Sequence, residues 1–144
     1  MSSFRIFDIA GAGMSAQSVR LNTVASNLAN AESVSGNPNT VYRARHPVFQ
    51  AVAAALNSTA ANYSGDAGAS VEVKGIVESQ AAPERRYDPA NPMADSSGYV
   101  YAPNVNTVEE MVDMISASRS YQNNVEVMNT ARSLLLATLK LGQA

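Results

Sequence analysis

Apolar residues recur at alternating steps of three and four positions near the start of the chain. Seven of the eight positions in this series are apolar, and a spacing of about 3.5 residues is that of a left-handed coiled-coil seam. The series stops before the turn-forming residues 33–38. It predicts a long N-terminal helix whose seam holds Phe7, Ala10, Met14, Gln17, Leu21, Val24, Leu28 and Ala31.

The same spacing returns near the end of the chain and predicts a second helix over residues 107–141. Thr107 and Glu110 have capping-box spacing, so we expect Thr107 to cap the amide of Glu110 while the Glu110 side chain reaches back. Gly142 follows as the expected terminator. The seam of this helix holds Met111, Met114, Ser118, Tyr121, Val125, Met128, Arg132, Leu135 and Leu139. A second stripe holds Val127, Ala131, Leu134 and Leu141.

The length of the C-terminal helix bears on the overall shape. At the standard rise per residue, a helix over residues 107–141 is about 52 Å long. A compact globule of this chain length has a diameter of roughly 37 Å. The protein is therefore expected to be elongated, or to pack this helix on other subunits.

The middle of the chain indicates short strands joined by loops. Apolar and polar residues alternate over residues 41–45 and 71–77, and residues 98–101 form a third candidate strand. Residues 57–68 have the composition of a mobile loop. The predicted class is α+β: an elongated molecule in which two long terminal helices pair as an antiparallel coiled coil beside a small β-rich central region. The expected division is 1–35 and 107–144 for the helical assembly domain, and 36–106 for the central region.

The composition excludes several classes of function. Ala, Ser and Asn make up 54 of 144 residues, whereas Val, Leu, Ile and Phe make up only 30, close to the level at which disorder is suspected. The absence of cysteine and the single histidine disfavour a zinc site. The formal net charge of −2 disfavours a nucleic-acid-binding surface. Neither a cleaved signal peptide nor an apolar run of transmembrane length is expected.

Candidate catalytic and ligand-binding motifs are weak. Residues 11–16 (GAGMSA) match the loose dinucleotide fingerprint, but no apolar second strand follows. Glu109, Glu110 and Asp113 could hold a hard cation, yet the helix dipole is a sufficient reason for acidic residues at this end. His46 is interpreted as structural. The residues thus predict no catalytic, cofactor or metal site, and a binding or structural protein in place of an enzyme.

The seams are the candidate functional surface, since small and polar residues surround them. The predicted assembly seam consists of Met14, Leu21, Val24, Leu28, Met111, Met114, Tyr121, Val125, Met128, Leu135 and Leu139. Polar side chains near a seam can fix the register of paired helices, and a buried charge there needs a partner. The candidates for that role are Asn22, Asn27, Asn30 and Arg132.

Both ends of the chain resemble one known family. Residues 13–17 (GMSAQ), 20–30 (RLNTVASNLAN) and 109–127 (EEMVDMISASRSYQNNVEV) resemble the terminal signatures of bacterial flagellar basal-body rod proteins. The segments 87–89, 98–100 and 103–106 are similar to the joining segment of proximal rod members of that family.

The resemblance implies a structural subunit of the periplasmic rod that assembles through its terminal helices and transmits torque. It implies export through the flagellar type III apparatus without signal cleavage. The implied partners are copies of the chain, other rod subunits, and basal-ring and export-gate components, with no nucleic acid, small-molecule substrate or membrane span. From the residues alone, a cytoplasmic helical-hairpin adaptor or export chaperone stays open as the alternative, with a nucleotide-dependent enzyme as a remote third.

Overall fold

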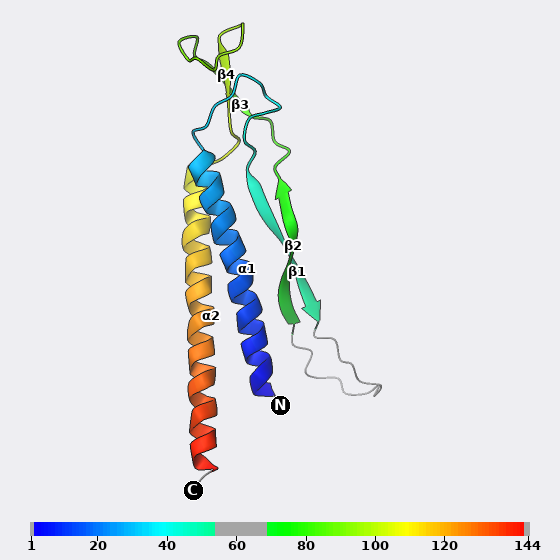
Figure 1. Ribbon diagram of the computed structural model, residues 1–144, viewed down its shortest axis with the longest axis vertical. Coiled ribbons are helices and arrows are strands. Elements are labelled where there is room, and N and C mark those ends of the chain that lie inside the picture. Colours follow the sequence, from blue (N-terminus) through cyan, green and yellow to red (C-terminus); the bar gives the residue numbers. More distant parts are fainter. Residues whose placement is uncertain (1, 54–68, 143–144) are drawn as a thin grey trace.

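Two long antiparallel helices form the body of the molecule (Figure 1). The computed structural model describes residues 2–53 and 69–142, and places helix α1 at Ser2–Asn30 and helix α2 at Thr107–Leu141. The two helices pack side by side, and both chain ends lie at the same end of the elongated molecule. The α+β class, the antiparallel pairing and the bounds predicted for the second helix are confirmed. Because α2 has 35 residues and α1 has 29, α2 extends beyond its partner.

A β-hairpin covers the side of α1 that faces away from α2 (Figure 1). Strand β1 (Arg45–Ala53) pairs antiparallel with strand β2 (Ala69–Glu78). Val71 and Val73 of β2 lie beside Ala12, Ala16 and Val19 of α1. A two-stranded sheet is marginal by itself in water, so its contact with α1 supplies much of its stability. Helix α1 is therefore the central layer, between α2 and the hairpin.

A second hairpin lies beyond the end of the helix pair that is opposite the chain termini (Figure 1). It joins β3 (Glu84–Tyr87) to β4 (Tyr99–Ala102). Ser35 extends this sheet, because its backbone exchanges hydrogen bonds of 3.0 and 2.8 Å with the backbone of Tyr101. The buried side of β4 carries Val100, which is fully enclosed.

Strand prediction in the middle of the chain was only partly right. The strand predicted over residues 71–77 lies within β2, and the one over 98–101 overlaps β4. The strand predicted over 41–45 is wrong apart from Arg45, the first residue of β1. The Ala44 carbonyl accepts from the Ser79 N–H at 2.7 Å, but the Ala44 N–H donates to Asn104 Oδ1 at 2.8 Å and not to the backbone of a neighbouring strand. Most of β1 and all of β3 went unpredicted. The predicted loop over 57–68 lies outside the described residues.

Small side chains dominate the buried core, which includes Ala10, Ala16, Ala44 and Ala117 among its apolar members. The two helices approach closely at Gly13, where a Cβ would lie 2.8 Å from the Nδ2 atom of Asn124. Many of the buried positions are therefore occupied by alanine, which allows close packing. Because bulky apolar residues are scarce, a single chain has only a small hydrophobic core.

Candidate assembly surfaces

The first turn of α2 is capped one residue earlier than the sequence predicted. Asn106 is the N-cap: its Oδ1 atom accepts hydrogen bonds from the backbone N–H groups of Val108 at 3.1 Å and Glu109 at 3.4 Å. The prediction of a Thr107–Glu110 capping box is therefore wrong. Asn competes well for the cap position, and Thr107 becomes the first helical residue. With the cap satisfied, the side chain of Glu110 is free to face α1.

Asn27 connects α1 to both neighbouring layers. Its side chain is fully buried and makes four hydrogen bonds, which use both amide hydrogens and both acceptor positions of the oxygen. The Nδ2 atom donates to Glu110 Oε1 of α2 at 2.8 Å and to the Arg45 carbonyl at 2.9 Å. The Oδ1 atom accepts from the Arg45 N–H at 2.9 Å and from Tyr42 Oη at 2.8 Å. We call Asn27, Tyr42, Arg45 and Glu110 the Asn27 cluster.

Glu110 is a buried carboxylate paired with a neutral amide. The residue is 6% exposed, and burial raises its pKa above the ordinary value, while the Asn27 hydrogen bond and the charge of His46 oppose that rise. In the described part of the chain, the salt bridges at α2 and β1 join Arg20 to Asp113 at 2.6 Å and Arg45 to Glu78 at 3.1 Å. These two arginines are thus engaged with other carboxylates.

The other candidates for fixing the helix register lie differently. Asn22 is exposed on α1, and Arg132 is exposed on α2. The Asn30 side chain donates to the Ser26 carbonyl of its own helix at 2.8 Å. Within one chain, only Asn27 of the four predicted residues bridges the two helices through an observed hydrogen bond.

The predicted seam residues divide between the inside of the helix pair and its surface. Val24 is buried. The half-buried members are Met14, Leu21, Leu28, Met114, Val125, Met128 and Leu135. The exposed members are Met111, Tyr121 and Leu139. The buried residues Glu110 and Ala117 show that the face of α2 turned toward α1 is rotated away from Met111.

An apolar stripe runs along the first half of α2 on the side opposite α1. We call Val108, Met111, Val112 and Ile115 the upper stripe; they are 55% to 68% exposed. Their spacing of i, i+3, i+4 and i+7 places them on one helix face. The sequence pattern indicated only Met111, because it assigned a single apolar face to the first half of this helix, whereas that half has a second apolar face. Contiguous exposed apolar residues of this kind mark an interaction surface.

A second apolar surface lies toward the other end of the helix pair. Ile6 of α1 and Val127, Ala131 and Leu134 of α2 line a groove of about 460 Å³. Beyond it, the last turns of α2 expose Leu134, Leu136, Leu139 and Leu141 by 48% to 79%. We call the groove and these leucines the lower surface. A helix that is apolar on several sides is stable when other elements bury it.

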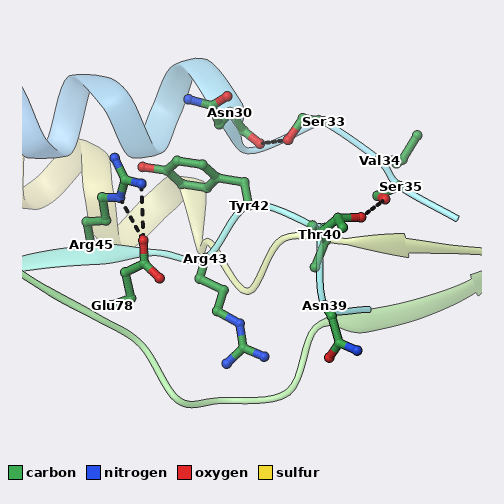
Figure 2. A pocket seen from close by; sticks show the side chains of 11 residues that line it. Asn30, Ser33, Val34, Ser35, Asn39, Thr40, Tyr42, Arg43, Arg45 and Glu78 are labelled. Carbon is green, nitrogen blue, oxygen red and sulfur yellow. Dashed lines mark hydrogen bonds and ion pairs between the residues drawn. The ribbon is translucent and has the colours of Figure 1, made fainter. Parts of the chain in front are cut away.

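A polar pocket of about 500 Å³ lies beside the C-terminal end of α1 (Figure 2). Figure 2 shows the Arg45–Glu78 ion pair at one side of Tyr42 and the Ser35–Thr40 hydrogen bond of 2.8 Å at the other. The residues that line it contain no nucleophile with an adjacent base. The lining of this pocket thus offers no nucleophile–base pair of the kind that covalent catalysis uses.

The other candidate chemical motifs are also accounted for. Residues 11–16 lie inside α1, so the strand–turn–helix context that a dinucleotide fingerprint requires is absent there. Across residues 2–53 and 69–142, no three His, Cys, Asp or Glu side chains are placed to hold a metal ion. Among the same residues, no helix combines the length and apolar character of a membrane span.

The long helix pair and its exposed apolar surfaces are typical of a protein that assembles with others, and comparison with known proteins identifies a structural protein. The family model for flagella basal body rod proteins matches residues 7–36. The model for the C-terminal part of the flagellar basal body rod FlgEFG proteins matches residues 96–141. These two matches cover α1 and α2 almost completely.

Full-length relatives narrow the family. The chain is 52% identical to the flagellar basal-body rod protein FlgC of Salmonella typhimurium and to that of Escherichia coli O157:H7, with 99% of this chain and all of each relative covered. It is 36% identical to FlgC of Bacillus subtilis over the same shares of the two chains. The chain belongs to the FlgC family of flagellar basal-body rod proteins. It is a structural protein and not an enzyme, and the adaptor or chaperone alternative is not favoured.

Proposed function

We propose that this chain is a subunit of the proximal part of the flagellar basal-body rod, that it assembles with its neighbours through α1 and α2, and that the assembled helices transmit torque. The observation that carries this proposal is the exposed apolar surface of α2 at both ends of the helix pair. The names of the FlgC relatives support the same assignment.

The division of labour along the chain follows from where the apolar residues lie. Residues 1–35 and 107–144 would form the assembly domain, and residues 36–106 would form a central region that neighbours contact less. The predicted seam then serves two contacts. Its half-buried members close the helix pair, and exposed members such as Met111 and Leu139 meet neighbouring subunits.

The partners in this proposal are copies of the chain, other rod subunits, and components of the basal ring and export gate. The location is the periplasmic rod, which the chain would reach through the flagellar export apparatus without signal cleavage. Low charge supports dense packing of many similar subunits, since only 15% of residues are charged and repulsion between copies is small.

The upper stripe gives a direct test. In cells that lack the native chain, Val112→Asp should abolish incorporation into isolated basal bodies, because an acidic group would be buried against an apolar neighbour. Val112 is exposed in the single chain, so the purified variant should unfold at the same temperature as the wild type. The matched control is Ser116→Asp, an exposed residue of α2 beside the stripe, which should incorporate normally. Normal incorporation of Val112→Asp would contradict the proposal.

A further inference from the structure

The polar pocket beside the C-terminal end of α1 holds one more positive charge than negative. Its charged lining residues are Arg43, Arg45 and Glu78. Arg45 and Glu78 neutralise each other, because Nε and Nη2 of Arg45 donate to the same Glu78 oxygen at 3.2 and 3.1 Å. Arg43 has no hydrogen-bond or ion-pair partner in the described ranges 2–53 and 69–142, and no dashed line reaches it in Figure 2. One guanidinium in the pocket is therefore uncompensated.

Arg43 is partly removed from water without gaining a partner. The residue is half-buried, whereas arginine is mostly exposed in folded proteins unless it is paired. Arg20 is half-buried as well, and it is paired with Asp113 at 2.6 Å. Removing a cation from water without a hydrogen-bonded anion costs free energy. An anionic group that entered the pocket would offset that cost, so the pocket is suited to an anion.

The chain on either side of Arg43 is held by hydrogen bonds. Tyr42 Oη donates to Asn27 Oδ1 at 2.8 Å, and the Ala44 N–H donates to Asn104 Oδ1 at 2.8 Å. Figure 2 shows the Arg43 side chain extending away from α1, on the other side of this segment from the Tyr42 ring. The guanidinium is thus presented by a segment that is already fixed, and little of the backbone must be ordered when an anion binds.

We propose that this pocket receives a carboxylate side chain of a neighbouring subunit, which the Arg43 guanidinium holds. The planar guanidinium presents paired N–H donors that match the two oxygens of a carboxylate. One uncompensated positive charge matches one carboxylate, whereas a phosphate group carries about −1.5 to −2. The pocket of about 500 Å³ has room for the end of an Asp or Glu side chain. The inference rests on the proposed function, because assembly is what brings a second chain to the pocket.

Zero-length coupling in isolated basal bodies tests which group lies against position 43. Arg43→Lys keeps the positive charge and supplies an amine. A carbodiimide activates a carboxylate, and an amine in contact with it forms an amide bond while the activating group leaves as a urea. Mass spectrometry of the linked peptides should show position 43 joined to an Asp or Glu of a neighbouring subunit. Coupling to Glu78 of the same chain alone, or no coupling at position 43, would overturn the proposal.

The purified chain tests the other source of an anion. Inorganic phosphate, followed through the side-chain resonances of Arg43, should show no saturable binding in the micromolar range. Saturation of the pocket by micromolar phosphate would assign it to a free anion and overturn the docking of a neighbour. Arg43→Gln should unfold at the same temperature as the wild type, since Arg43 has no partner in the single chain.

Incorporation into basal bodies tests the need for the charge. Arg43→Gln should lower incorporation by about tenfold or more, and Arg43→Lys should restore most of it. The matched control is Arg86→Gln on the exposed strand β3, which should incorporate normally. If Arg43→Gln incorporates normally while Val112→Asp does not, the carboxylate site is overturned and the proposed function stands. Normal incorporation of both variants would contradict both.

Discussion

The Nδ2 atom of Asn124 in α2 lies 2.8 Å from the position that a Cβ on Gly13 of α1 would occupy. The Asn124 side chain occupies this space because Gly13 has no side chain of its own. A second glycine, Gly11, lies two positions earlier in the same helix, and a Cβ added there would have nothing within 4 Å. The two glycines thus offer a matched pair in one helix.

Alanine substitutions should separate packing from helix propensity. Gly11→Ala should raise the free energy of unfolding by about 0.5–1 kcal/mol, since alanine is the better helix former. Gly13→Ala gains the same propensity, but it displaces the end of the Asn124 side chain, so it should stabilise the protein less than Gly11→Ala does. Chemical unfolding followed by circular dichroism measures the free energy of unfolding of both variants. Equal stabilisation by the two substitutions would show that the helices do not approach closely at Gly13.

The position of the α2 cap gives a second prediction. Asn106→Ala removes the acceptor for two backbone N–H groups and should destabilise the protein by about 1 kcal/mol. Thr107→Ala removes an exposed side chain that is not the cap, and should change stability by about 0.5 kcal/mol or less. Equilibrium unfolding measures both losses of stability. A larger loss for Thr107→Ala than for Asn106→Ala would favour the capping box that the sequence predicted.

Seam residues toward the end of α2 should be needed for assembly more than for folding. Leu139 is 55% exposed, so Leu139→Asp should leave the circular dichroism spectrum unchanged while it blocks motility and incorporation into basal bodies. Val125→Asp and Leu135→Asp should block assembly as well, with some loss of helix pairing because both residues are half-buried. Asn129→Asp, on an exposed part of α2, is the control. Normal swimming of all three seam variants would contradict the assigned seam.

The free subunit should be vulnerable to proteases at the C-terminal end of α2. Helix α1 does not extend along the last turns of α2, and their leucines are exposed (Figure 1). Limited proteolysis of dilute monomer, read by mass spectrometry, should therefore show early cleavage within residues 134–141, before cleavage in β2. A monomer that resists cleavage throughout this segment would mean that the single chain completes its own core.

Local signals explain what the sequence could predict. The bounds of α2 follow from its regular spacing, its acidic first turn and the glycine after it, all of which lie in one continuous segment. Most of strand β1 was not predicted, because its apolar residues do not alternate strictly and Pro47 lies near its start. The cap was misplaced by one residue because Asn106 and Thr107 are both good cap formers, and the choice depends on backbone geometry.

Long-range contacts explain what the sequence could not predict. Asn22, Asn27 and Asn30 are all candidates for fixing the helix register, and nothing in their local sequence distinguishes them. Asn27 is selected because Glu110, Tyr42 and Arg45 converge on it after folding. The upper stripe was missed for a related reason. The face of α2 that meets α1 carries the Asn27–Glu110 and Arg20–Asp113 contacts, which join residues far apart in sequence and leave no local pattern.

A density map of an intact basal body, with this subunit traced in it, would test the proposed assembly through α2 most directly. We expect the upper stripe, residues 108–115, and the last turns of α2, residues 134–141, to lie against helices of neighbouring subunits. We also expect the antiparallel pairing of α1 with α2 to be kept. A map in which these two parts of α2 face solvent, with neighbours held through the β3–β4 hairpin alone, would contradict the proposal.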